Sequence, residues 1–204
     1  MLQETFIALA EKYTTDKRRA AELWNEIATN YSGKKRYYHT LQHLENLLRC
    51  LQEVKPVIKD WDTVLFSLYY HDIIYNPLKT VNEEKSAEFA SNRMQSIGIS
   101  AGMIQNCVQQ VLATKKHVAS TDDDTNYFTD ADLSILGQDW EVYAAYYQNV
   151  RKEYSLYPDI IYVPGRKKVL EHFLEMDRIF KTDHFFHKFE LQAKENLQRE
   201  LDAL

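Results

Sequence analysis

The sequence predicts an all-α protein, because three features of the chain favour helices. Apolar residues recur every three or four positions over long stretches, as on one face of a helix. No stretch alternates apolar and polar residues in the way that a half-buried strand does. Glycine and proline are scarce, with five and four residues in a chain of 204, so signals for tight turns are few. The length fits one domain with a substantial core.

The N-terminal half is expected to form five helices separated by short breaks. Asp16 is the expected N-cap of the second helix and Asn82 that of the fifth, since small polar residues favour this position. Pro56 ends the third helix and the Asn76-Pro77 pair ends the fourth. The periodicity places these helices at residues 4–13, 18–31, 44–54 and 61–75, and from Asn82 to the approach of Gly98.

The C-terminal half is expected to add four helices. Residues 120–126 are acidic and polar but lack the Gly and the terminal Glu of an EF-hand, so we interpret them as a solvated connection. Pro158 and the Pro164-Gly165 pair mark a further connection. The helices are expected at residues 101–115, 139–154, 166–180 and 182–201.

A histidine and an aspartate lie side by side in the apolar run of residues 65–75. These residues, His71 and Asp72, interrupt a stretch that should be buried. A buried carboxylate is costly unless it is paired, hydrogen-bonded or bound to a metal. For the doublet alone, a His-Asp hydrogen bond inside the core is the favoured explanation, so a metal site needs further ligands elsewhere.

Two other segments offer such ligands. His39 and His43 are four residues apart and would share one face of a helix, although an isolated pair of this kind is more often surface or packing histidines. Thr40 stands where the zincin signature has Glu, which excludes that protease motif. Asp130 and Asp132 point about 200° apart on a helix, so we expect at most one to face the core. Asp132 has the more apolar neighbours and is the better candidate.

Charge and composition exclude several classes of function. A net charge of -5 gives no basic surface for an extended nucleic acid. No apolar run approaches the roughly 20 residues that span a bilayer, and the N-terminus lacks the features of a signal peptide. Cys50 and Cys107 are too few for a disulfide framework and are expected to be core thiols in a reducing compartment. We therefore expect a cytoplasmic protein without a membrane partner.

The order of one His, a His-Asp doublet and a distant Asp resembles the signature of the HD superfamily of metal-dependent phosphohydrolases. The similarity is greatest to small stand-alone bacterial HD-domain proteins and covers nearly all of the chain. The similar segments are Arg36-Tyr37-Tyr38-His39 with His43, His71-Asp72 with Tyr75 and Pro77, Asn82-Glu83-Glu84 with Ser86-Ala87, Asp130-Ala131-Asp132-Leu133 through Gly137, and Arg151, Glu153 and Tyr154.

Two short segments also resemble cyclic-nucleotide phosphodiesterases of the same superfamily. Residues 38–43 are similar to their Tyr-His-Asn-x-x-His, and residues 131–134 to their Ala-Asp-Leu-Ser. These matches imply that His43 rather than His39, and Asp132 rather than Asp130, binds metal. Thr40 replaces their Asn and the chain is too short for their full catalytic domain, so cyclic nucleotides are not the implied substrate.

The resemblance implies one HD-type helical bundle over residues 1–204 that hydrolyses a phosphoester or phosphoanhydride of a small, nucleotide-like metabolite. His39 is the expected proton donor, with His117 as the alternative. The expected metal ligands are His43, His71, Asp72 and Asp132. Candidate phosphate contacts, for which an ordinary solvated surface is as good an explanation, are Arg36, Lys115, His117 and Arg151. Glu83 or Glu84 is a candidate to orient the attacking water, although both also complement the N-terminus of a helix.

The donor set bears on the metal and on the rival functions. Two imidazoles and two carboxylates suit Mn, Zn, Co, Ni or Fe better than Ca, and Mg is possible at a second site bridged by Asp72.

The first alternative to a hydrolase is a non-catalytic metal- and nucleotide-binding sensor. The second is a di-iron oxygenase of HD type, for which only His117 and the Glu83-Glu84 pair offer extra ligands. A structural zinc site is disfavoured because such sites prefer Cys. A homo-oligomer is possible.

Overall fold

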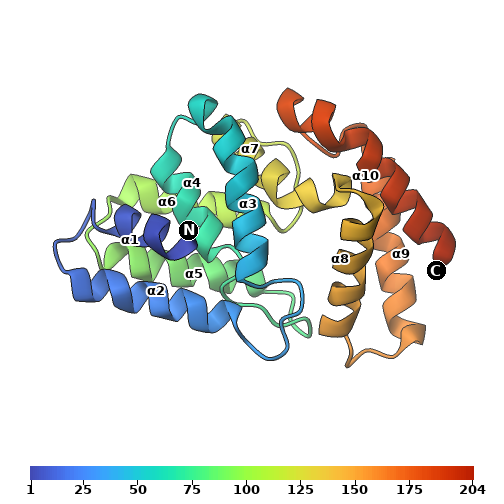
Figure 1. Ribbon diagram of the computed structural model, residues 1–204, viewed down its shortest axis with the longest axis horizontal. Coiled ribbons are helices and arrows are strands. Elements are labelled where there is room, and N and C mark those ends of the chain that lie inside the picture. Colours follow the sequence, from blue (N-terminus) through green and yellow to red (C-terminus); the bar gives the residue numbers. More distant parts are fainter.

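Ten α-helices and two short 3₁₀ helices make up the secondary structure of the computed structural model, which describes residues 1–204 (Figure 1). The absence of strands confirms the predicted all-α class. The α-helices are α1 (Leu2–Ala10), α2 (Lys17–Tyr31), α3 (Leu41–Val54), α4 (Trp61–Tyr70), α5 (Asn82–Gln95), α6 (Ala101–Ala113), α7 (Asp123–Leu133), α8 (Trp140–Glu153), α9 (Asp159–Glu175) and α10 (Asp183–Ala203), and the 3₁₀ helices are η1 (Lys55–Val57) and η2 (Ser134–Gly137).

The helices form two groups that share one core. Helices α1, α2, α4, α5 and α6 lie together on one side of α3, and α8, α9 and α10 lie on the other, as Figure 1 shows. A single hydrophobic cluster contains buried residues of both groups, from Phe6 on α1 to Leu197 on α10. No helix combines the length and the apolar character that crossing a membrane requires.

The C-terminal group is held by one buried ion pair and one close backbone approach. The guanidinium of Arg166 on α9 donates to both carboxylate oxygens of Glu200 on α10, at 2.7 and 2.8 Å. Glu200 also accepts a hydrogen bond from the hydroxyl of Tyr143 on α8, so one carboxylate joins the three helices. At Gly137, a Cβ atom would lie 2.5 Å from Cβ and 2.6 Å from the carbonyl oxygen of Phe189. Only glycine therefore allows η2 to pack this closely against α10.

Helix ends differ from the sequence prediction where tertiary hydrogen bonds decide them. Helix α4 ends at Tyr70, not near residue 75, which places the His71-Asp72 doublet in the following turn. Val81, not Asn82, is the N-cap of α5, because the Asn82 side chain instead bonds backbone groups of the preceding loop.

Two expected connections are also partly helical. Helix α7 begins at Asp123 within the segment expected to be a solvated connection, since the side chain of Asp122 accepts from the N–H of Thr125 as an N-cap. Helix α9 begins at Asp159 and contains Pro164, which was expected to lie in a connection. Pro164 has no N–H to donate to the carbonyl oxygen of Ile160. Because Ile160 is exposed, this carbonyl can accept a hydrogen bond from water instead.

Candidate metal centre

Three side chains from three parts of the fold converge on one buried point. His43 is the third residue of α3, His71 follows the end of α4, and Asp132 lies near the end of α7. The Nε2 atoms of the two histidines are 3.0 Å apart. Oδ1 of Asp132 lies 3.3 Å from Nε2 of His43 and 3.6 Å from Nε2 of His71. These three residues could hold a metal ion.

The spacing of these donor atoms matches the spacing around one ion. Two ligand atoms bound about 2.1 Å from a metal are about 3.0 Å apart at a right angle and about 3.4 Å apart at the tetrahedral angle. The two histidine nitrogens and the Asp132 oxygen are separated by 3.0, 3.3 and 3.6 Å. The cluster is therefore shaped for a shared cation, and its nitrogen and oxygen donors suit a divalent transition metal.

Hydrogen bonding leaves Nε2 of His71 as the atom that can bind a metal. Nδ1 of His71 lies 3.0 Å from the carbonyl oxygen of Leu68, which can only accept, so Nδ1 carries a proton. This backbone contact fixes the orientation of the ring, as is usual for metal-binding histidines.

The carboxylates around His71 favour the charged form of its imidazole. Burial alone would lower the pKa of His71, but the neighbouring carboxylates of Asp72 and Asp132 outweigh it and raise this pKa to about 9. Burial lowers the pKa of His43, which is therefore the neutral member of the pair. A cation bound here takes the place of the proton on His71.

Asp72 lies at the edge of the cluster. Its Oδ2 is 3.1 Å from Nε2 of His71, 3.9 Å from Nε2 of His43 and 3.8 Å from Nε2 of His39. Burial would raise the pKa of Asp72, but the imidazoles of His71 and His39 outweigh it and hold this pKa below its usual value. An ionised carboxylate at this place can complete a coordination shell.

The turn after α4 explains how two adjacent residues reach one point. On a helix, neighbouring side chains do not share a face, but α4 has already ended at Tyr70. The N–H of Asp72 donates to the hydroxyl of Tyr31 on α2, and the hydroxyl of Ser86 on α5 bonds both backbone groups of Ile74. These contacts fix the turn in which His71 and Asp72 lie.

Glu153 organises the segment that carries His39. One oxygen of this buried carboxylate accepts hydrogen bonds from the backbone N–H groups of Tyr37, Tyr38 and His39, at 2.7, 2.8 and 3.1 Å. The other accepts from Nδ1–H of His39 at 2.7 Å. Burial would raise the pKa of Glu153, but these hydrogen bonds lower it to about 2.

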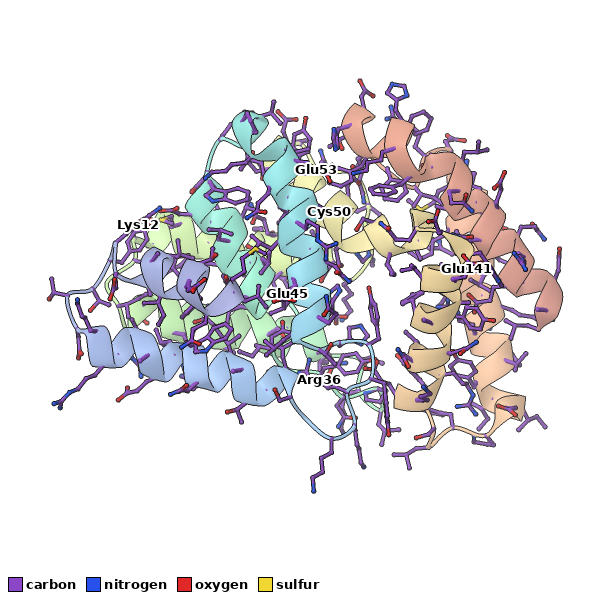
Figure 2. The ribbon with its side chains drawn as sticks, viewed as in Figure 1. Lys12, Arg36, Glu45, Cys50, Glu53 and Glu141 are labelled. Atoms are coloured by element: carbon purple, nitrogen blue, oxygen red, sulfur yellow. The ribbon has the colours of Figure 1, made fainter.

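Sequence reasoning did not assign Glu153 a role. It follows Arg151 and Lys152 at the end of α8, in a setting that is typical of an exposed helix terminus. Its one signal was membership in the segments that resemble HD-domain proteins. Its contacts with the loop between α2 and α3, where Figure 2 labels Arg36, depend on tertiary structure.

His117 contacts the opposite side of Asp132. Its Nε2 lies 3.0 Å from Oδ2 of Asp132, whose Oδ1 faces the two histidines of the cluster. His117 is the one non-glycine residue with a positive φ, at 51°. This left-handed conformation is unfavourable for a side chain with a Cβ, and such outliers concentrate at functional sites. Its ring orients the carboxylate that would bind the metal.

The two arginines that were candidate phosphate contacts bond groups of the protein itself. Arg36 donates to the carbonyl oxygens of His39 and Ile73, at 3.0 and 2.9 Å. Arg151 bonds the carboxylate of Asp159 and the carbonyl oxygen of Tyr157. Both arginines hold loops beside the cluster in place.

Lys115, Glu83 and Glu84 form an ion-paired group near the cluster. Nζ of Lys115 contacts the carboxylate of Glu84 and lies 3.8 Å from that of Glu83. Lys115 and Glu83 line the cavity beside the cluster, whereas Glu84 does not. Lys115 is thus the one lysine or arginine that lines this cavity.

Of the Asp130/Asp132 pair only Asp130 faces the core, in keeping with the expectation that at most one does so. Asp130 is fully buried, and its oxygens accept from the backbone N–H groups of Lys181 and Thr182 at 3.0 and 2.7 Å. It thereby secures the segment before α10, while Asp132 belongs to the cluster. The two carboxylates lie on different faces of α7: Asp130 is fully buried, whereas Asp132 is partly exposed in the wall of the cavity beside the cluster.

Two cavities reach the cluster. One of about 320 Å³ is lined by His39, His43, Asp72 and Asp132, with tyrosines and aliphatic residues of α8 and α9 on its far wall. Another of about 390 Å³ touches His43 and Asp132 and runs between α3 and α10, past Cys50 and Glu53, both labelled in Figure 2. The cluster is therefore accessible to small molecules.

Comparisons of the chain with protein-family models, with curated proteins and with solved structures found no match. The structure itself shows a cluster of His43, His71 and Asp132 that could hold a metal ion.

Proposed function

We propose that the protein is a metal-dependent phosphohydrolase that cleaves a phosphoester or phosphoanhydride of a small metabolite. One observation carries this proposal. Two imidazole nitrogens and a carboxylate, spaced for one cation, lie in the wall of a cavity that also contains His39. The resemblance to HD-domain proteins supports the same class of reaction.

Four residues would hold the ion. His43, His71 and Asp132 supply the cluster, and Asp72 is the fourth ligand, 3.1 Å from Nε2 of His71. When bound, a divalent metal supplies a Lewis acid that polarises a phosphoryl oxygen and lowers the pKa of water. The open cavity supports a catalytic rather than a structural role, because structural zinc sites are closed.

His39 is our candidate for the residue that delivers the proton that hydrolysis requires. In the reaction a bond forms between a water oxygen and phosphorus, and the bond from phosphorus to the leaving oxygen breaks. The attacking water gives up a proton in this step, and the leaving oxygen takes one up. Glu153 accepts from Nδ1–H of His39, so Nε2, which faces Asp72 and the cavity, is the atom that can donate it. His117 is the weaker candidate because its Nε2 contacts Asp132.

The proposal is tested by metal content and turnover measured on the same samples. Phosphate release would be measured from a panel of phosphomonoesters and nucleotides, with Mn, Mg, Co or Zn added. We expect wild type to bind metal and release phosphate, and Asp72→Ala to lose both. Asp177→Ala is the matched control, since Asp177 is exposed and only its backbone oxygen accepts a hydrogen bond. An active, metal-replete Asp72→Ala variant would refute the ligand assignment.

The same samples separate the rival functions. Metal retention with saturable nucleotide binding but no turnover would favour the sensor. Bound iron with oxygen consumption would favour the oxygenase. Either result would overturn the proposed hydrolysis while leaving the metal cluster in place.

A further inference from the structure

A second cavity lies between α8 and α9, next to the metal cavity. It has a volume of about 400 Å³. Val150, Tyr154 and Val169 line both cavities, so the two adjoin along one wall. A group bound in this second space would therefore be a near neighbour of a phosphate bound at the cluster.

Three tyrosines form an aromatic wall in the second cavity. The ring centroid of Tyr154 lies 6.0 Å from that of Tyr157 and 5.9 Å from that of Tyr162. Offset and tilted rings at this separation attract each other, and the ring surfaces that face the cavity can attract a further ring in the same way. Ile161 and Val169 add aliphatic side chains to the lining.

The lining offers no free charge. Its one ionic group, Arg166, is neutralised by two hydrogen bonds to Glu200. The Tyr146 ring, 5.6 Å from this guanidinium, covers it further. An uncharged group is therefore the chemistry that the cavity accepts at least cost, because a charged one would be desolvated without a partner.

Gly165 lines this space. It lies inside α9, where glycine is less stable than alanine by roughly 1 kcal/mol. Nothing lies within 4 Å of the position that its Cβ would occupy, so packing does not require the glycine. A large side chain at this position would therefore extend into the cavity without a clash with the protein.

We infer that this cavity, hereafter the ring pocket, binds an uncharged aromatic ring of the substrate, which we assign to the class of aryl or heteroaryl phosphate monoesters. The inference rests on the proposed function. A monoester is favoured over a polyphosphate because Lys115 is the one lysine or arginine in the metal cavity and is paired with Glu84. Arg36 and Arg151 bond other parts of the protein.

The test measures ring binding separately from catalysis. Naphthyl phosphate is titrated into the metal-free and the metal-loaded protein, and binding is followed by naphthalene fluorescence, with glycerol phosphate as the ring-free competitor. Gly165→Phe fills the ring pocket, and Gly165→Ala adds only a methyl group. Gly102→Phe is the matched control, because Gly102 is also helical, exposed and without a neighbour within 4 Å of its Cβ position.

We expect Gly165→Phe to weaken naphthyl phosphate binding by about tenfold, the contribution of the aromatic contacts that it displaces. Gly165→Ala and Gly102→Phe should bind as wild type does, and equal thermal midpoints would show that the variants fold. An unchanged affinity in Gly165→Phe would overturn the ring pocket. A change of oligomeric state in that variant, without a change of affinity, would overturn it in favour of an interface between two copies.

The outcomes for the ring pocket and for the proposed function are distinct. Ring binding without phosphate release from any compound would retain the pocket and refute the hydrolase. Hydrolysis of naphthyl and glycerol phosphates with equal KM values, unchanged by Gly165→Phe, would retain the hydrolase and refute the pocket.

Discussion

Replacing Glu153 by glutamine isolates the negative charge that holds His39 in place. The carboxylate is buried and accepts four hydrogen bonds, three from backbone N–H groups and one from the imidazole. Its pKa is lowered from 4.5 to about 2. At about 1.36 kcal/mol per pKa unit, this difference corresponds to a stabilisation of the folded protein by about 3 kcal/mol at neutral pH.

The sign of the pH dependence follows from the direction of the shift. Because the folded pKa is the lower one, the stabilisation is fully present above about 4.5 and is lost as the pH falls toward about 2. We therefore expect Glu153→Gln to unfold about 3 kcal/mol more easily than wild type at pH 7. The difference in free energy of unfolding between the two proteins should shrink by about 2 kcal/mol between pH 5 and pH 3, because only wild type loses the charge.

The assay is urea denaturation followed by circular dichroism at several pH values. Glu141→Gln is the matched control, since Glu141 is exposed at the opposite end of the same helix, as Figure 2 shows. It should change stability by less than about 0.5 kcal/mol. The role of the charge would be refuted if Glu153→Gln were as stable as wild type at pH 7. It would also be refuted if the difference in free energy of unfolding between the two proteins stayed constant down to pH 3.

Two further substitutions test packing and backbone strain. Gly137→Ala should destabilise the fold by about 3 kcal/mol, because the new methyl group would clash with the backbone of Phe189. Gly102→Ala should stabilise the fold by about 0.5–1 kcal/mol, because its new methyl group meets no other atom. Equal urea midpoints for the two variants would contradict this expectation. His117→Gly should be more stable than His117→Ala by about 1 kcal/mol, since both remove the contact with Asp132 but only glycine relieves the positive φ. Differential scanning calorimetry of the pair measures this, and equal midpoints would show that the backbone is unstrained.

The sequence predicted most helices because their apolar residues repeat at helical spacing, a local property. It was wrong where the helix ends depend on distant groups. Nothing between residues 65 and 75 indicates that α4 ends at Tyr70, since the turn after it is held by Tyr31 and Ser86. Pro164 was interpreted as a break, but it lies inside α9, where the carbonyl that it leaves unbonded belongs to an exposed residue.

The candidate site was predictable to the extent that its residues are unusual for their local sequence. Histidine and aspartate in an apolar run indicate a polar cluster, and the structure brings His43, His71 and Asp132 within reach of one ion. Charged residues in polar segments carry no such signal. The sequence therefore could not show that Arg36 bonds backbone carbonyls, or that Glu153 is buried against His39.

The features of this molecule that are costly in isolation gather around the two adjoining cavities. His117 adopts a left-handed backbone, Asp72 and Asp132 are largely covered carboxylates beside the histidines of the cluster, and Gly165 lies inside a helix. A core selected for stability alone would use apolar side chains at the first three positions and alanine at the fourth. Since natural proteins depart from such local preferences mainly where function requires it, the common location of these departures supports one site that extends from the cluster into the ring pocket. The aromatic part of a substrate and its phosphate would then be bound by separate walls of this site, so that Gly165→Phe alters binding of the ring and Asp72→Ala alters retention of the metal.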